Sequence, residues 1–138
     1  MKTTGELGKL VKHGTREELA GPDFDSMPAH EYLRKLLDDR KLKTTDLISR
    51  CNLDRSYAYQ LVNGTRVPSR DLILSIGLEL RFTEREMQRM LKLAERPVLY
   101  VRNRRDAAIL YALGNNLGRD GAADLLRELG EEIGRAHV

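Results

Sequence analysis

The chain contains one cysteine, no tryptophan and only two phenylalanines among its 138 residues. A single thiol excludes a disulfide within the chain and a cysteine-based zinc site. The three histidines, His13, His30 and His137, lack the spacing of metal ligands, so we expect no metal and no other cofactor. A chain of this length can bury a hydrophobic core without such devices. Cys51 is expected to be a core thiol, with a redox switch as the alternative.

Long hydrophobic runs are also missing. No stretch approaches about 18 consecutive apolar residues, so we expect no membrane-spanning helix and no membrane partner. The first residues, MKTTGELGKLVKHGT, lack the apolar stretch of a secretion signal, and together with the lone cysteine this predicts a cytoplasmic location. No run alternates between apolar and polar residues, and apolar residues mostly recur at intervals of three and four. This spacing predicts an all-helical fold.

The sequence offers no indication of an enzyme. No nucleophile–base pair stands out, and Gly114, Gly118 and Gly121 lack the preceding strand that a dinucleotide-binding loop requires. The net charge is +3, with a pI near 9.1, which favours an anionic partner only weakly. We therefore expect a binding protein. Because the net charge is small, the distribution of charge along the chain must indicate what the protein binds.

Capping residues and apolar spacing predict five helices between residues 26 and 95. We expect Ser26 to cap the first of them and a Thr83–Glu86 capping box to start the last. The expected helices span about 26–40, 44–51, 54–62, 68–80 and 83–94. Residues 1–25 form a separate N-terminal segment, in which a short helix is predicted at about 16–20.

The remainder of the chain repeats the pattern of the fourth and fifth helices with a shift of 35 residues. Arg70-Asp71 aligns with Arg105-Asp106, and the apolar positions that follow match without a gap. We predict two tandem helical hairpins, 68–95 and 103–130, packed on each other or on a second subunit. Chance similarity between amphipathic helices is the alternative.

Three arginines, Arg102, Arg104 and Arg105, cluster at the start of the first helix of the second hairpin. Cations are unfavourable at a helix start because the helix dipole is positive there, and Asp106 offsets this only in part. Two interpretations stay open. The arginines form either a solvated helix start with arginine–aspartate pairs, or a second site for phosphate or an acidic partner.

The stretch NLDRSYAYQLVNGTRVPSR, residues 52–70, gives the strongest indication of function. Asp54 is a strong N-cap, and Asn63-Gly64 ends the helix after about two turns. With Ala58 and Leu61 facing the core, polar side chains must project outward. The outward residues are Arg55, Ser56, Tyr59 and Gln60, with Tyr57 at the margin.

Residues 42–68 resemble the helix-turn-helix of the Cro and phage-repressor family, which is xenobiotic-response-element-like. Leu47 and Ile48 occupy the buried positions of the first motif helix. Asn52 stands at the turn, where the family usually has glycine, and the close N-G-x-R-x-P is reproduced. The match runs without a gap over about 27 residues.

A longer likeness covers residues 29–131, which are similar to small bacterial regulators with a helical C-terminal extension. The predicted fold is an all-α, five-helix repressor-like domain at 26–95, followed by a C-terminal helical hairpin and tail at 96–138. Further positions depart from the family pattern. Lys43 occupies the usual cap position of the first motif helix, so Thr44 is expected to cap instead, and Val62 replaces a frequent glutamate.

The resemblance implies that the protein binds double-stranded DNA and regulates transcription. Arginine can read guanine with two hydrogen bonds, and glutamine can read adenine in the same way. The expected base-reading residues are Arg55, Ser56, Tyr57 and Gln60. The expected phosphate contacts are Lys43, Thr44, Tyr59, Thr65 and Arg66, including backbone amides at Thr44 and around Thr65.

Charge distribution agrees with this hypothesis. Residues 41–70 contain six basic and two acidic side chains, a surplus of four against three for the whole chain. We expect a homodimer on half-sites one helical turn apart, about 34 Å. The C-terminal hairpin is the expected dimer surface, or the surface for a protein partner. The alternative is a helix-turn-helix fold used as a protein-binding adaptor or an antitoxin-like partner.

Overall fold

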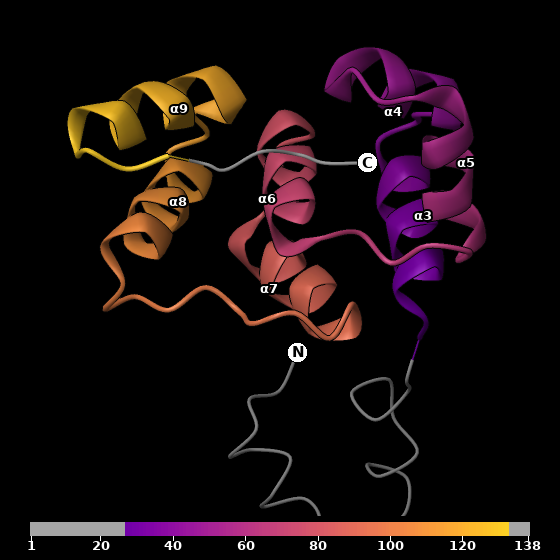
Figure 1. Ribbon diagram of the computed structural model, residues 1–138, viewed down its shortest axis with the longest axis horizontal. Coiled ribbons are helices and arrows are strands. Elements are labelled where there is room, and N and C mark those ends of the chain that lie inside the picture. The colour runs from indigo at the N-terminus through magenta and orange to yellow at the C-terminus, as the bar shows by residue number, and fades with distance from the viewer. Residues whose placement is uncertain (1–26, 133–138) are drawn as a thin grey trace, which may run out of the picture.

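The computed structural model describes residues 27–132, which form seven α-helices (Figure 1). In chain order they are α3 (Ala29–Asp39), α4 (Thr44–Cys51), α5 (Arg55–Asn63), α6 (Arg70–Glu79), α7 (Glu84–Leu93), α8 (Arg104–Gly114) and α9 (Gly118–Glu128). No strand occurs within these residues, which confirms the prediction of an all-helical fold. The short helix predicted at 16–20 lies outside the described residues.

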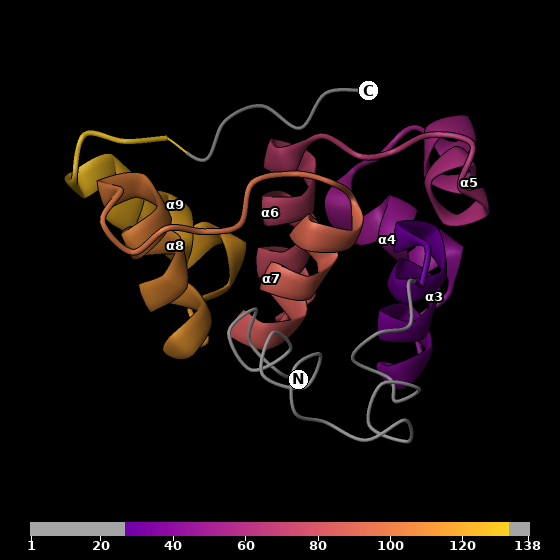
Figure 2. The same cartoon turned by 90° about the horizontal axis from the view of Figure 1, so that it is seen from below.

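Helix α6 lies at the centre, between α3, α4 and α5 on one side and α8 and α9 on the other (Figures 1 and 2). Every residue from Leu72 to Leu78 is buried. A helix that is apolar on all sides must be covered on all sides, and α4, α7 and α9 all pack against α6. The two halves of the chain therefore share one helix.

Side-chain caps start four of the helices. Asp54, Ser69, Thr83 and Asn103 each accept a hydrogen bond from the backbone N–H three residues on, at 3.0–3.2 Å. The predicted capping box is complete, because the N–H of Thr83 also donates to Glu86 at 2.8 Å. Each such cap stabilises its helix by about 1 kcal/mol.

Two helix starts differ from the prediction. α3 begins at Ala29, and Pro28 occupies its capping position in place of Ser26. Proline suits a helix start because it has no N–H to leave unsatisfied. Lys43, and not Thr44, precedes α4 as its N-cap residue. The carboxylate of Asp46 accepts the N–H of Lys43 at 2.7 Å, so an acid in the first turn replaces the expected hydroxyl cap.

The pairs α6–α7 and α8–α9 pack on each other, with α9 against α6 and α8 against α7. Two crossed ion pairs join their starts. Arg70 binds Asp106 at 2.9 Å, and Arg105 binds Asp71 at 2.9 Å. Each Arg-Asp pair of one repeat therefore binds the corresponding pair of the other, with the arginine of one contacting the aspartate of the other. The positions that align in the sequence repeat thus form reciprocal ion pairs between the two helix pairs.

The arginines before α8 lie in two environments. Arg105 is half-buried and donates to Asp71 and to the carbonyl oxygen of Glu132. Arg102 and Arg104 are exposed, and neither forms an ion pair within residues 27–132. Arg105 is therefore a structural residue, in agreement with the arginine–aspartate interpretation.

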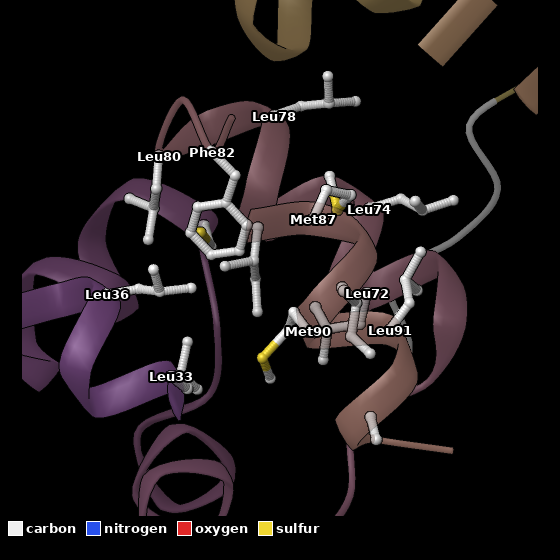
Figure 3. Close-up of a cluster of buried hydrophobic side chains, with 14 of the residues drawn as sticks. Leu33, Leu36, Leu72, Leu74, Leu78, Leu80, Phe82, Met87, Met90 and Leu91 are labelled. Atoms are coloured by element: carbon white, nitrogen blue, oxygen red, sulfur yellow. The ribbon is translucent and has the colours of Figure 1, made fainter. Parts of the chain in front are cut away.

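The core between α3, α6 and α7 is built from leucines, methionines and one phenylalanine (Figure 3). Gly77 lets α6 approach α7 closely: a Cβ atom there would lie 2.3 Å from Cε of Met87 and 2.8 Å from Cδ2 of Phe82. Both neighbours are almost completely buried. The side chain of Met87 fills the space that a larger residue at 77 would need.

We expect Gly77→Ala to lower the free energy of unfolding by about 1–3 kcal/mol through overpacking. The gain in helix propensity, about 1 kcal/mol, opposes this loss. The matched control is Gly114→Ala, because a Cβ atom at 114 would meet nothing within 4 Å. Urea unfolding followed by circular dichroism measures both. Equal stabilities for the two variants would contradict the close approach at Gly77.

Arg40 joins three helices at one point. Its guanidinium donates to the carbonyl oxygens of Leu36 (3.2 Å), Leu80 (2.9 Å) and Arg81 (3.2 Å). It also binds the carboxylate of Glu86 at 2.7 Å. The group thereby satisfies carbonyls at the ends of α3 and α6 while pairing with the first turn of α7. A side chain about one-fifth exposed makes all of these contacts.

The stability of the fold should depend on pH through the ionisation of Glu86. Burial alone would raise its pKa, but the hydrogen bonds from Arg40 and from Thr83 outweigh burial and lower the pKa below 4.5. A folded pKa below the unfolded value means that the stabilisation is complete above about pH 4.5 and is lost as the pH falls through the folded pKa. We expect the stability difference between wild type and Glu86→Gln to shrink across that range in urea unfolding. Glu84→Gln, at an exposed position in the same helix turn, is the matched control.

Candidate nucleic-acid interface

Helices α4 and α5 are joined by a tight turn at Asn52, which has a left-handed backbone with φ of 53°. This confirms the expected helix stop. Leu47 and Ala58 are completely buried and Leu61 is 1% exposed, so the three predicted anchors hold the two helices in the core. α5 packs on both α3 and α4. The remaining side of α5 faces outward at the edge of the molecule (Figure 1).

The outward side of α5 carries most of the residues that the sequence placed there. Arg55 and Ser56 are exposed, whereas Tyr59 and Gln60 are half-buried. Tyr57 does not lie at the margin as predicted, because it is 5% exposed. It stands four residues before Leu61, so the two share the buried face of the helix. We therefore leave Tyr57 out of the base-reading residues.

Two arginines stack on the tyrosines of this helix. The guanidinium of Arg55 lies 5.4 Å from the ring centre of Tyr59, and that of Arg66 lies 5.7 Å from the ring centre of Tyr57. Such cation–π contacts restrict the guanidinium without using its N–H donors. Both arginines keep those donors for an acceptor outside the chain.

The positive charge around α5 is not neutralised by neighbouring carboxylates. The basic side chains are Lys41, Lys43, Arg50, Arg55 and Arg66, and none of them forms an ion pair within residues 27–132. Asp46 and Asp54, the two acids of this region, accept backbone N–H groups instead. Arg70 does not contribute to this surface as expected, because it binds Asp106 and the carbonyls of Pro97 and Val98. The surplus is still three over residues 41–66.

The predicted phosphate contacts lie at the two ends of this surface. Lys43 and Thr44 stand at the start of α4, with Lys43 exposed. Thr65 and Arg66 follow α5 and are both exposed. The N–H of Thr65 already donates to the carbonyl of Gln60 at 3.0 Å, so at Thr65 itself the hydroxyl is the group left for a phosphate.

Gly64 and His30 form a contact that the sequence did not predict. Gly64 ends α5 with φ of +81°, and a Cβ atom there would lie 2.4 Å from Nδ1 of His30. The conformation and the space both require glycine. The Asn63-Gly64 pair predicts a turn from the sequence. Nothing in the sequence pattern indicated that His30 of α3 would lie against Gly64.

Cys51 is the last residue of α4 and faces the core. The thiol is buried, and burial raises its pKa to about 11. Such a thiol is protonated at neutral pH and is a poor nucleophile. Within residues 27–132 no group of three or more His, Cys, Asp or Glu side chains could hold a metal ion, and no helix is long and apolar enough to cross a membrane.

Comparison with known proteins leaves the family open. No family model matches the chain, and neither a curated protein nor a solved structure matches it. The resemblance of residues 42–68 to the Cro and phage-repressor helix-turn-helix therefore remains a prediction. The surface of α5 itself is what indicates a function.

Proposed function

We propose that the protein is a sequence-specific DNA-binding regulator that places α5 in the major groove, with α4 and α5 as its helix-turn-helix. One observation carries the proposal: α5 presents Arg55, Ser56 and Gln60 on its outer side while its other side is fixed in the core. Arg55 forms no ion pair within residues 27–132. The major groove admits an α-helix, and residues near the N-terminus of the helix meet base edges.

The residues divide into two roles in this proposal. Arg55, Ser56 and Gln60 read bases, since arginine suits guanine and glutamine suits adenine. Stacking on Tyr59 holds the guanidinium of Arg55 in one direction before DNA arrives, which reduces the entropy lost on binding. The phosphate contacts come from Lys43 and Thr44 at one end and from Thr65 and Arg66 at the other, with Tyr59 beside them.

A homodimer would supply two such helices for two half-sites about 34 Å apart. The face around α8 and α9 supports a contact of this kind. Six of the seven large hydrophobic side chains that are exposed within residues 27–132 lie between Val98 and Leu129. The same surface could take a different protein, in which case the helix-turn-helix would serve as an adaptor or antitoxin-like partner.

Selection of bound duplexes from a random pool tests the proposal directly. We expect a conserved, approximately palindromic site and an affinity that falls steeply with salt, because phosphate contacts release counterions. Failure to enrich any sequence at low salt would overturn the proposal and favour the adaptor. Analytical ultracentrifugation of the full chain with and without the selected duplex gives the stoichiometry.

A further inference from the structure

A cavity of about 270 Å³ lies beside the end of α5. The start of α3, the loop after α5 and the end of α7 form its walls. Its apolar lining includes Leu33, Leu61, Val67, Met90, Leu93 and Ala94. A dry cavity of about 150 Å³ is enough to bind benzene, so this one has room for a small ring or a short alkyl chain.

Met90 gives the cavity an adaptable inner wall. Its side chain is 2% exposed and lies between this cavity and a narrower apolar space that Phe82 and Ile76 help to line. Methionine rearranges easily because its side chain is unbranched and has three rotatable bonds.

The polar groups of the lining have opposite charges on opposite walls. Arg66 stands on the α5 side and forms no ion pair within residues 27–132, whereas Glu95 stands at the end of α7. His30 lines the cavity from the start of α3. The backbone of the loop is fixed, because the amides of Thr65 and Arg66 both donate to the carbonyl of Gln60. An anionic group is therefore favoured on the α5 wall and disfavoured near Glu95.

We propose that this cavity binds a small carboxylic acid with an apolar body. The carboxylate pairs with the guanidinium of Arg66, and the alkyl or aryl body lies between Leu33, Leu93 and Met90. Charge and shape thus determine one orientation, with the acid toward α5. A pocket that is mostly apolar with a few polar groups at one end is the usual form of a small-molecule site.

The consequence for regulation rests on the proposed function. Arg66 is assigned there as a phosphate contact, and its guanidinium cannot pair fully with a carboxylate and a DNA phosphate together. Occupation of the cavity should therefore weaken DNA binding. The acid would act as an inducer that releases the protein from its site.

The experiment uses the full chain and three probes with the same chain length: octanoate, octanol and octylamine. Chemical shifts of backbone amides in ¹H–¹⁵N spectra report binding. We expect octanoate to shift the amides of Gly64, Arg66, Leu93 and Ala94, and to bind at least about tenfold more tightly than octanol, which cannot form a charge-assisted pair with Arg66. Equal affinities for the three probes, or no shift at these amides at millimolar octanoate, would overturn the proposal.

Two variants separate the head group from the cavity. Arg66→Gln should reduce octanoate affinity by about tenfold and leave octanol unchanged. Val67→Trp, at an exposed position in the lining, should weaken all three probes by filling the mouth of the cavity. Arg85→Gln, an exposed arginine on α7 outside the cavity, is the matched control. Unchanged octanoate binding in Arg66→Gln would contradict the assignment.

DNA binding is then measured separately with the selected duplex. Octanoate should raise the Kd for DNA in the wild type and have no such effect in Arg66→Gln. A protein that binds octanoate at these residues but binds no DNA would overturn the proposed function and leave the acid site standing. A protein that binds DNA but not octanoate would overturn the acid site and leave the proposed function standing.

Discussion

Replacing Arg40 with alanine should lower the free energy of unfolding by about 3 kcal/mol. The substitution leaves the carbonyls of Leu80 and Arg81 without their donor, and it leaves the carboxylate of Glu86 without its cation in a half-buried position. It also removes the cation 5.2 Å above the ring of Phe82. Urea unfolding at neutral pH, followed by circular dichroism, measures the loss.

Two further variants identify the origin of this effect. Arg40→Lys keeps the charge but loses the planar fork that reaches several acceptors at once, so we expect it to recover only a minor part of the stability. Lys35→Ala breaks the Lys35–Asp39 pair on the same helix, where both side chains are about half exposed, and should change stability by at most about 0.5 kcal/mol. An effect of Arg40→Ala no larger than that of Lys35→Ala would contradict the role of Arg40 as a junction.

Replacing Arg55 with alanine should reduce discrimination at one base pair by about 1–3 kcal/mol, or roughly 5- to 150-fold, if α5 reads the major groove as proposed. Gln60→Ala should act in the same way at a different base pair. Both positions lie on the outer side of α5, and neither is among the fully buried core residues. The changes should therefore affect sequence preference without unfolding the protein.

Comparison of selected sites for each variant measures this prediction. Lys43→Ala should instead weaken binding to all sequences alike and reduce the salt slope by about one, because it removes a phosphate contact. Arg85→Ala, which removes the same charge far from α5, should leave both properties unchanged. The interface is wrong if Arg55→Ala, Lys43→Ala and Arg85→Ala all weaken binding to the same extent.

Local patterns in the sequence predicted the helices well because helix starts and ends depend on neighbouring residues. The oxygen of Thr83 caps a helix wherever the next turn follows, and Asn52 adopts its left-handed conformation for local reasons. Buried apolar positions such as Leu47 and Leu61 follow from helical periodicity alone. The 35-residue repeat also places α8 and α9 correctly, since it depends on the same periodicity.

Contacts between distant residues were not predictable in this way. Arg70 was counted among the charges for DNA, but it binds Asp106, which is 36 residues away. Arg40 carried no local signal for its role as a junction, because its acceptors on Leu80, Arg81 and Glu86 lie 40 or more residues further along the chain. Tyr57 is a different case, because its position four residues before Leu61 indicates the buried face of the helix from the sequence alone.

The position of α6 has a consequence for how the chain denatures. Its buried surface is covered from one side by α4 and from the other by α9. If either half unfolded alone, apolar side chains of α6 would be exposed to water on that side, so the two halves should unfold together. A chain truncated after residue 95 would expose the apolar surface of α6 that α9 normally covers, and it should aggregate. Heating should accordingly give a single sharp transition across both halves, with no plateau between them.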